Sequence, residues 1–362
     1  MPHDPVKLMI IVGARPNFVK VAPLFWEFGK NRKFDPILVH TGQHYDYGMS
    51  QIFFDDLDIP KPGYNLGIGS GNHGAQTGEM LAGLEKIIIQ KHPAAVVVVG
   101  DVNSTLAGAL AAAKLLIPVA HIEAGLRSYD KDMPEEVNRV LTDHISDLLF
   151  CPTAAAVKNL KKEGITKGVI NTGDIMLDIL KKKIGGRAPK IIGDLKIKPK
   201  EYLLLTVHRA SNTDNVENFK KIIEALAEIN EDVVFPMHPR TRKIIGQGQL
   251  LADINKLSHV HIVDPVSYLE MLLLEKNAKK IITDSGGVQK EAYWLGVPCV
   301  TLRDATEWTE TLGGGWNIIV GTDRVKIVKA IRRPHPRAPR RDYYGNGTAA
   351  KKIIRSLFKL TA

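Results

Sequence analysis

The stretch AAVVVVGD at residues 94–101 decides the fold, because its four consecutive valines do not alternate with polar side chains. A β-branched run of this kind is typical of a strand buried on both faces of a parallel sheet. The run ends at Asp101, an acid at the carboxyl end of the predicted strand. Open α/β sheets bind ligands at this edge. We therefore predict a parallel α/β sheet with a polar site at the carboxyl ends of its strands.

Strand and helix patterns alternate on both sides of this stretch. In the first half, strands are predicted at 6–12, 36–40, 94–100, 118–124 and near Phe150, with helices that include 103–116 and 135–149. Pro16 suits the first turn of a helix after the first strand, and Asn103 and Ser104 suit the caps of the helix after residues 94–101. The order predicts a doubly wound sheet with right-handed crossovers.

The composition changes at residues 181–200, which are rich in Lys, Gly and Pro, and the strand–helix pattern then restarts. We interpret this segment as an inter-domain connector. A chain of 362 residues also favours two domains. We predict a first domain over 1–180, a second over 181–345, and a last helical segment at 346–362.

The overall composition indicates a soluble globular protein, with 44% hydrophobic and 24% charged residues. We find no apolar run of membrane-spanning length and no signal peptide before the first strand. Cys151 and Cys299 are the two cysteines, and we expect both to be buried thiols in a reducing compartment. The expected location is therefore the cytoplasm, with no membrane partner.

The net charge of +10 leaves several interpretations open. Nucleic acid is one, but the aromatic content is low and no known reader motif occurs. Part of the excess lies in the basic stretch 331–341, which is typical of a solvated connector. An anionic small substrate also suits a basic protein, and we expect that rather than nucleic acid.

Three acids in the first half are candidates for catalysis, and each has an ordinary alternative. Asp101 follows a buried strand, where it is either functional or a turn acid. Glu123 ends the next strand, and its alternative is an ion pair with Arg127. Glu135 opens a helix after Pro134, where the helix dipole stabilises any acid. Three acids at strand and helix ends together favour acid–base chemistry.

The second half carries a candidate phosphate site. TDSGGVQKEA at 283–292 is predicted as a strand that runs through Ser285, Gly286 and Gly287 into a helix start, whose free amides suit a phosphate. Glu291 lies one to two turns along and suits ribose hydroxyls. His208 closes another strand, where it either faces solvent or contacts developing negative charge. The alternative for the glycines is an ordinary turn.

Two other patterns are set aside. GSGNHG at 69–74 matches a dinucleotide-binding motif but does not follow the first strand, so we interpret it as a glycine-rich helix lead-in. His40 and His44 have no carboxylate or Cys partner at metal-ligand spacing, so we predict no metal site.

Eight motifs, in this order along the chain, resemble those of the non-hydrolysing UDP-N-acetylglucosamine 2-epimerases: GARPNFVK (13–20), GQHYD (42–46), GD (100–101), HIEAGLRS (121–128), MPEEVNR (133–139), HR (208–209), TDSGGVQKEA (283–292) and RDATEWTE (303–310). The resemblance covers nearly the whole chain. It implies two Rossmann-like domains of the glycosyltransferase-B type with an inter-domain cleft, a last helix that crosses back onto the first domain, and a homodimer.

The resemblance also implies roles for individual residues. Asp101, Glu123 and Glu135 match the catalytic acids, and His208 the histidine near the diphosphate. The remaining matches concern the bound UDP: Arg15 and Lys20 as basic contacts, Ser285, Gly286 and Gly287 as the phosphate loop, and Glu291 as the ribose ligand.

Three departures from the family pattern bear on function. Met271 stands where the family commonly has an aromatic residue near the uracil position. The family often has T-E-R-P-E where this chain has TEWTE at 306–310, so Trp308 replaces an arginine that contacts the nucleotide. Tyr45 stands where members regulated by their own substrate carry an arginine. These departures leave open the sugar that is used and its regulation.

The implied reaction is epimerisation at carbon 2 of UDP-N-acetylglucosamine by elimination and re-addition of UDP, with neither metal nor other cofactor. The alternatives are an epimerase for a modified sugar such as a diacetamido uronate, a hydrolysing epimerase, a glycosyltransferase of the same fold, and a non-catalytic UDP-sugar-binding protein. The three acids favour an epimerase over the last two.

Overall fold

The computed structural model describes residues 4–30, 33–42, 54, 57–185, 189–246 and 249–361, except for the side chains of Arg15 and Thr361. The chain divides into two compact units. The first comprises Met1–Lys182 together with Asp342–Ala362, and the second comprises Lys183–Arg341. The chain therefore leaves the first unit once and returns to it for its last segment.

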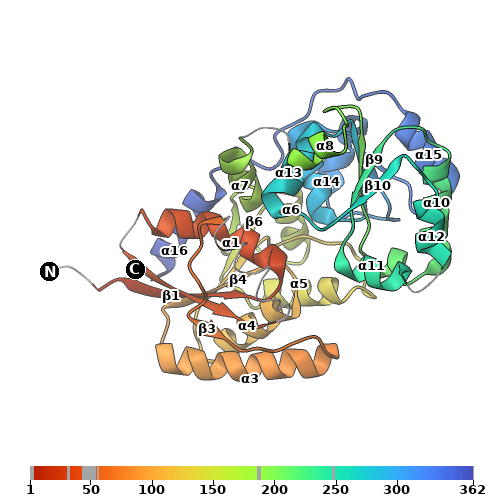
Figure 1. Cartoon of the computed structure of the whole chain (residues 1–362). Helices are drawn as coiled ribbons and strands as arrows, with labels where there is room; N and C mark the ends of the chain where they lie inside the picture. The colour runs from red at the N-terminus through yellow and green to blue at the C-terminus, as the bar shows by residue number, and fades with distance from the viewer. Residues whose placement is uncertain are drawn as a thin grey trace. The chain divides into compact units, whose positions relative to one another are not determined.

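The first unit is built on a seven-stranded parallel sheet in the order β3-β2-β1-β4-β5-β6-β7 (Figure 1). Its strands are β1 (Val6–Val12), β2 (Phe34–His40), β3 (Tyr64–Asn65), β4 (Ala95–Val99), β5 (Val119–Ile122), β6 (Leu148–Cys151) and β7 (Val169–Asn171). The order reverses between β1 and β4, which pair in parallel with Ile10 opposite Val97. This reversal is the switch point of a Rossmann-like sheet, where ligands bind beyond the carboxyl ends of the strands.

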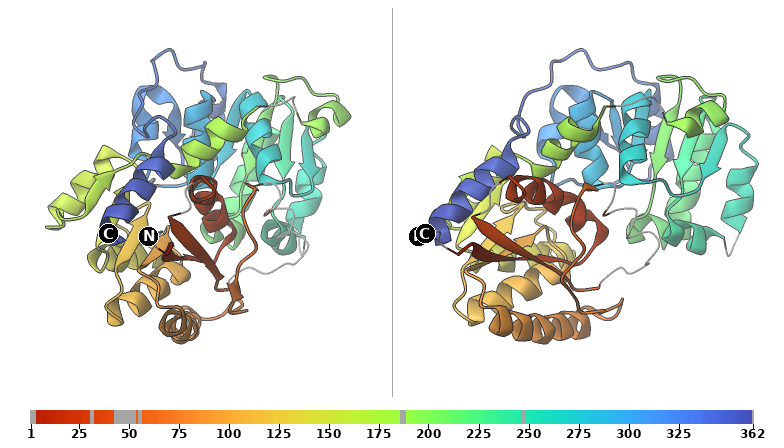
Figure 2. Two further views of the ribbon diagram at one scale, coloured as in Figure 1. Left: turned by 90° about the vertical axis from the view of Figure 1, so that its left-hand side faces the viewer. Right: turned by 60° about the vertical axis from the view of Figure 1, so that its left-hand side comes forward.

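Helices cover both faces of this sheet: α1 (Arg15–Phe28), α3 (His73–Lys91), α4 (Asn103–Lys114), α5 (Pro134–His144), α6 (Ala154–Lys162), α7 (Ile175–Lys183) and α16 (Ala349–Thr361). The C-terminal helix α16 packs beside α1 in the first unit (Figure 1 and Figure 2). Asp178 accepts hydrogen bonds from the amides of Ala349 and Ala350 at 3.0 and 2.9 Å, and Ile353 and Leu357 are fully buried. Capping and apolar burial together therefore hold α16 in this unit.

The second unit repeats the arrangement with a six-stranded parallel sheet in the order β10-β9-β8-β11-β12-β13. Its strands are β8 (Leu203–Thr206), β9 (Val233–Pro236), β10 (Val260–Val263), β11 (Lys280–Thr283), β12 (Cys299–Thr301) and β13 (Asn317–Ile319). The switch point lies between β8 and β11. The prediction of two doubly wound, Rossmann-like α/β domains is confirmed.

Alternating side chains of these strands enter two separate cores, because successive residues of a strand point to opposite faces. Leu203 and Leu205 lie in one core, and Leu204 lies in the other. The covering elements are α8 (Lys190–Asp194), α9 (Ala210–Thr213), α10 (Val216–Ala227), α11 (Pro239–Ile245), α12 (Gln249–Asn255), α13 (Tyr268–Asn277), α14 (Gly286–Leu295), the 3₁₀ segment η1 (Thr309–Gly315) and α15 (Arg324–Arg332).

Two local predictions are wrong. Part of the expected connector 181–200 belongs to the second unit, because Ile192 and Ile197 are buried in one of its cores. Asn103 and Ser104 do not cap α4, whose N-cap is Val102 without a side-chain bond. Ser104 instead bonds Thr41 at 2.9 Å within the buried interior.

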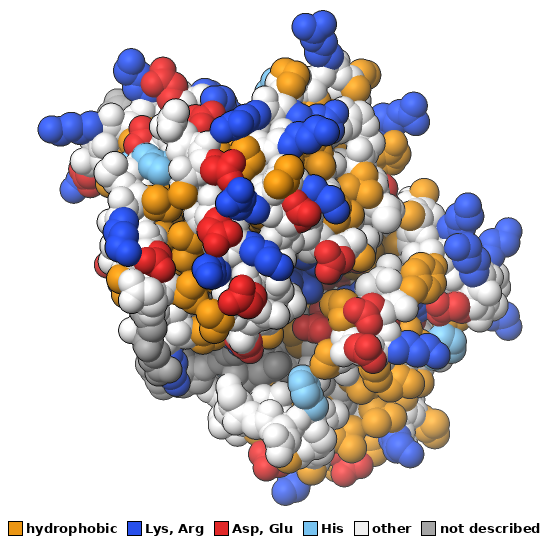
Figure 3. Space-filling model, turned by 90° about the vertical axis from the view of Figure 1, so that its right-hand side faces the viewer, with side chains coloured by type: hydrophobic (Ala, Val, Ile, Leu, Met, Phe, Trp, Pro, Cys, Tyr) orange, Lys and Arg blue, Asp and Glu red, His pale blue; other side chains and the backbone are white. Residues whose placement is uncertain are grey.

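The surface and the cysteines bear on the predictions from composition. Among the described residues, no helix is both long and apolar enough to cross a membrane. On the face drawn in Figure 3, basic side chains lie among acidic and hydrophobic ones. Cys151 and Cys299 are free and buried, as predicted, and burial raises the pKa of each thiol to about 12.

Candidate active site

Asp101 directly follows β4 and Gly100, at the switch point of the first sheet. It is not a helix cap, since Val102 takes that position. Arg139 of α5 donates from Nη2 to Asp101 Oδ2 at 2.5 Å, and the side-chain amide of Asn138 donates to the Asp101 carbonyl oxygen at 3.0 Å. Because the aspartate side chain is still 27% exposed, the ion pair orients a carboxylate that solvent can reach.

Glu123 directly follows β5, the strand next to β4, and forms an ion pair with Lys20 of α1. Both side chains are mostly buried. The alternative of an ion pair between Glu123 and Arg127 is wrong, because Arg127 bonds Asp143 and Glu163 instead. The sequence therefore predicted the position of Glu123 at a strand end but not its partner.

The backbone around this ion pair is left-handed at two positions. Glu123 has φ +72°, which is uncommon for a residue with a side chain, and Gly100 has φ +71°. A Cβ atom on Gly100 would lie 3.1 Å from Lys20 Nζ and 3.6 Å from Glu123 Oε2. The glycine thus leaves the space in which the ion pair lies.

Glu135 and Glu136 are neighbours in the first turn of α5, but they differ in solvent exposure. Glu136 is buried and accepts from the amides of Ser128 and Tyr129 and from Arg139. Glu135 is exposed. Helical spacing places Glu135 on the same face of α5 as Asn138 and Arg139, the two residues that bond Asp101. Glu135 is therefore the member of the pair that is accessible to a substrate.

A buried polar cluster supports the backbone between the acids. His121 lies with Nε2 at 2.8 Å from the Gly100 carbonyl oxygen and Nδ1 at 2.7 Å from Asp143 Oδ1. Asp143 also accepts from the amide of Gly125 at 3.1 Å and from Arg127 at 2.7 Å. Burial raises the pKa of Asp143, but the hydrogen bonds and charges of His121 and Arg127 outweigh it and lower the pKa overall. The cluster fixes the chain on both sides of Glu123.

Several of the predicted positions lie outside the described part of the chain. Arg15 begins α1, with Pro16 in the first turn as predicted, but its side chain lies outside the described part of the chain, as do residues 43–53 with His44 and Tyr45. His40 lies 3.2 Å through Nε2 from the Gly13 carbonyl oxygen. Within the described ranges, no group of three or more His, Cys, Asp or Glu side chains could hold a metal ion.

In the second unit, His208 follows β8 and lies at the switch point with β11. The amides of His208 and Arg209 donate to the fully buried carboxylate of Asp284, at 3.0 and 2.9 Å from Oδ2. Asn212 also donates to Asp284 at 3.1 Å. The sequence analysis missed this role of Asp284, which joins the ends of two strands and leaves the His208 side chain 40% exposed.

Ser285, Gly286 and Gly287 follow β11 and begin α14, as predicted. Ser285 is the N-cap, and its side chain makes no cap bond. A Cβ on Gly286 would lie 2.6 Å from Glu307 Oε1 and 3.0 Å from Trp308 Nε1, whereas one on Gly287 would meet nothing closer than 3.8 Å. Gly286 therefore leaves room for the segment that carries Trp308. Gly287 places no side chain on the open side of the turn.

Trp308 is buried, with Lys290 of α14 directly over its ring at 3.8 Å from Nζ to the centroid. Lys290 itself is only 1% exposed. A cation over an indole face is stabilised by the ring quadrupole. The residue that departs from the family pattern is thus part of the packing behind the Ser-Gly-Gly turn.

Glu291 of α14 and Met271 of α13 are the other two candidates in this unit. Glu291 is 3% exposed and accepts a hydrogen bond from the Tyr268 hydroxyl at 2.7 Å. Met271 is half-buried and packs against one core of the unit. Both helices begin beyond the carboxyl ends of the strands, so the six candidates of this unit lie near one end of its sheet.

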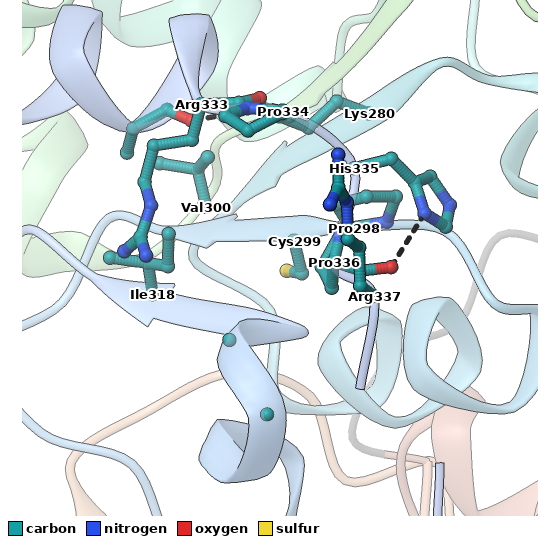
Figure 4. A pocket seen from close by; sticks show the side chains of 13 residues that line it. Lys280, Pro298, Cys299, Val300, Ile318, Arg333, Pro334, His335, Pro336 and Arg337 are labelled. Carbon is teal, nitrogen blue, oxygen red and sulfur yellow. Dashed lines mark hydrogen bonds between the residues drawn. The ribbon is translucent and has the colours of Figure 1, made fainter. Parts of the chain in front are cut away.

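A cavity of about 280 Å³ lies elsewhere in the second unit, lined by residues that include Lys280, Arg333, His335 and Arg337 (Figure 4). Lys280 is the first residue of β11, so this cavity lies at the amino ends of the strands. The Lys280 ammonium donates to the carbonyls of Ala330, Ile331 and Arg333 at 2.8, 2.5 and 2.9 Å. The Lys280 ammonium is thus bonded to the carbonyls at the end of α15. The cavity is separate from the predicted phosphate turn.

Comparison with known proteins gives a consistent family. A family model described as UDP-N-acetylglucosamine 2-epimerase matches residues 27–358. The UDP-N-acetylglucosamine 2-epimerase homolog of Methanococcus maripaludis is 54% identical, over 98% of this chain and 100% of that protein. The UDP-2,3-diacetamido-2,3-dideoxy-D-glucuronate 2-epimerase of Pseudomonas aeruginosa is 46% identical, over 98% and 100%.

Solved structures agree. The crystal structure of the Methanocaldococcus jannaschii UDP-GlcNAc 2-epimerase, in complex with UDP-GlcNAc and UDP, is similar with a TM-score of 0.91 and 45% identity. The similarity covers 98% of this chain and 100% of that one. With matches of this length in sequence and in structure, the chain belongs to the UDP-N-acetylglucosamine 2-epimerase family.

Proposed function

We propose that the protein reversibly epimerises UDP-N-acetylglucosamine at carbon 2 to UDP-N-acetylmannosamine. The observation that carries the proposal is the pair Asp101 and Glu123. They lie at the ends of adjacent strands at a switch-point edge, each beside a cation, in a member of this family.

The chemistry of the substrate explains why several carboxyl groups are needed. Carbon 2 of the sugar carries an amide nitrogen and has no adjacent carbonyl, so its proton is not acidic. Loss of UDP from carbon 1, with its bonding electron pair, leaves a cation that the ring oxygen stabilises. A base then removes the proton from carbon 2, which gives the 2-acetamidoglucal. UDP adds back to carbon 1 while an acid protonates carbon 2 from the opposite face.

The carboxyl groups of the first unit are assigned to the proton transfers. Asp101, Glu123 and Glu135 share the roles of base and acid in these transfers. Arg139 and Lys20 orient two of them. The resemblance assigns Lys20 to UDP. The contact that supports a role for Lys20 in this structure is its ion pair with Glu123.

The groups of the second unit are assigned to UDP. Ser285, Gly286 and Gly287 offer the free amides at the start of α14 to the diphosphate, and His208 offers an exposed imidazole. Glu291 is assigned to the ribose hydroxyls, and Met271 is assigned to the position near uracil. The acids and these groups belong to different units, and the proposal requires both for one reaction.

A modified 2-acetamido sugar is a second candidate substrate. It is favoured by the 46% identity to the Pseudomonas aeruginosa diacetamido uronate epimerase and by Trp308, which replaces an arginine of the usual pattern. The elimination is unchanged for such a sugar, since it concerns carbons 1 and 2 alone. Turnover of both UDP-sugars, measured side by side, separates the two candidates.

The test is incubation with UDP-N-acetylglucosamine in deuterated water. Deuterium at carbon 2 of both recovered UDP-sugars is expected, and the Glu123→Gln variant serves as the control. Release of free N-acetylmannosamine would instead identify a hydrolysing epimerase. Recovery of undeuterated, unchanged substrate, with UDP binding verified, would contradict the proposal. The homodimer implied by the resemblance stays a prediction, tested by light scattering of the purified protein.

A further inference from the structure

The first residue of α3, His73, belongs to the GSGNHG motif, to which the proposed function assigns no role. Helix α3 packs along α4 (Figure 1), and the His73 ring contacts Asn103, the first residue of α4. His73 Nδ1 is 3.1 Å from Asn103 Nδ2 and 3.5 Å from Asn103 Oδ1. His73 is exposed, whereas Asn103 is 4% exposed and lies two positions after Asp101. The imidazole therefore contacts a buried side chain that is close in sequence to a candidate catalytic acid.

A chain of three side-chain amides fixes the orientation of Asn103. At one end, Asn138 Nδ2 donates to the Asp101 carbonyl oxygen at 3.0 Å. At the other end, Gln76 Nε2 donates to the Gly69 carbonyl oxygen at 2.7 Å. Because backbone carbonyls only accept hydrogen bonds, these two contacts determine which atom of each end amide is the nitrogen. Between them, Asn138 Nδ2 also donates to Asn103 Oδ1 at 3.1 Å, and Asn103 Nδ2 donates to Gln76 Oε1 at 2.8 Å. The amide of Asn103 therefore has a single orientation that satisfies all of these contacts.

This orientation determines the tautomer of His73. Asn103 Nδ2 carries two hydrogens, and one of them is bonded to Gln76, so the other is available to His73 Nδ1 at 3.1 Å. Asn103 Oδ1 is farther from the ring and already accepts from Asn138. His73 Nδ1 is therefore an acceptor, and the hydrogen of the neutral ring is on Nε2. Among the described residues, none is hydrogen-bonded to His73 Nε2. The ring thus has an N–H donor that is available to a ligand.

His73 lies at the same edge of the sheet as the candidate acids. Helix α3 connects β3 to β4, two parallel strands, so it begins beyond the carboxyl ends of the strands. Asp101 follows β4 at this edge, and Asn138 joins its carbonyl to the amide that contacts His73. Ligands of Rossmann-like sheets bind at this edge. The His73 donor therefore lies on the side of the first unit where a substrate is expected.

We propose that His73 is a substrate-binding residue of the first unit, whose neutral imidazole donates a hydrogen bond from Nε2 to an oxygen of the sugar. The acceptors on a 2-acetamido sugar are its hydroxyls and its acetamido carbonyl. The inference rests on the proposed function, in which Asp101 acts at carbon 2 of the sugar and groups of the second unit hold UDP. It predicts an effect on the UDP-sugar and none on UDP alone.

The test measures kcat/KM for the UDP-sugar, and the affinity for UDP by calorimetry, in two variants. His73→Asn places an amide oxygen near the position of Nδ1, so it keeps the contact with Asn103 but is too short to reach the position of Nε2. It should lower kcat/KM by about three- to tenfold, the loss expected for one hydrogen bond, with the affinity for UDP unchanged. His73→Gln extends an N–H donor to the position of Nε2 and should keep most of kcat/KM. His92→Asn, which changes an exposed histidine at the other end of α3, is the control.

The tautomer is checked separately by nitrogen NMR of the histidine rings, with the His73 signals identified by their loss in His73→Asn. At mildly alkaline pH, the ring hydrogen of His73 should be on Nε2. A hydrogen on Nδ1 would overturn the inference, because the donor would then be directed to Asn103.

The outcomes separate the inference from its premise. Wild-type kcat/KM in His73→Asn would overturn the role of His73 and leave the proposed function standing. An equal loss of kcat/KM and of UDP affinity in both His73 variants would mean general damage and would also overturn that role. A wild-type protein that incorporates no deuterium at carbon 2 would contradict the proposed function itself, and the inference with it.

Discussion

Arg139 donates to Asp101 at 2.5 Å, and this contact joins the middle of α5 to the residue that follows β4 at the switch point of the first sheet. The same guanidinium also bonds Glu136 at 2.8 Å. Arg139 is therefore shared between a buried acid that fixes the loop before α5 and an accessible acid that is assigned to catalysis. The position of α5 and the orientation of Asp101 depend on one side chain.

The three acids are expected to be needed for turnover. Asp101→Asn, Glu123→Gln and Glu135→Gln should each lower turnover by at least about a hundredfold, the lower end for a positioned acid or base. UDP affinity should change far less, because other groups are assigned to the phosphates. Steady-state kinetics and calorimetry measure both. Glu85→Gln, an exposed acid of α3, is the matched control, and normal turnover of Glu123→Gln would refute the mechanism.

Gly100→Ala is expected to damage the site rather than only the fold. An alanine at φ +71° costs roughly 1–2 kcal/mol of unfolding free energy, and its Cβ would meet Lys20 Nζ at 3.1 Å. Turnover should fall because the ion pair with Glu123 must shift. Gly164→Ala provides the control, since it has φ +81° and no atom within 4 Å of the added Cβ. Equal turnover of the two variants would show that the space at Gly100 has no catalytic importance.

Ser285→Ala is expected to weaken the binding of UDP without weakening the fold. Loss of a hydrogen bond to a charged diphosphate should cost about 1.5–3 kcal/mol of binding free energy. The hydroxyl makes no cap bond to α14, so the unfolding free energy should hardly change. Titration calorimetry and urea unfolding measure the two quantities. Unchanged affinity would remove Ser285 from the diphosphate site.

Glu275→Gln is expected to stabilise the protein increasingly as the pH rises. Burial and the charge of Glu291 raise the pKa of Glu275 in the folded state. The stability linked to this proton is therefore full below the unfolded pKa of about 4.3 and is lost as the pH rises through the folded pKa. Urea unfolding at pH 5 and pH 8 should show a larger gain at pH 8. The exposed Glu201→Gln is the control, and a gain that does not depend on pH would contradict the raised pKa of Glu275.

The sequence predicted what depends on local pattern. The valine run at 96–99 and the Ser-Gly-Gly turn at 285–287 each lie where the apolar pattern and the glycines indicated. Partners distant in sequence could not be predicted. Lys20 and Glu123 are 103 positions apart, and no spacing rule links them. The need for a glycine at position 286 could not be predicted either, because it depends on Glu307 and Trp308 from a later loop.

The return of α16 to the first unit has a consequence for synthesis of the protein. Ribosomes release the chain from its N-terminus, so Lys183–Arg341 is a continuous segment that can fold as soon as it emerges. The first unit is in the opposite situation, because the surface of α1 that α16 covers stays open until Ala349–Thr361 has been translated. The domain that is made first is thus completed last. A stop codon shortly before Ala349 would leave the second unit intact and expose the apolar side of the first.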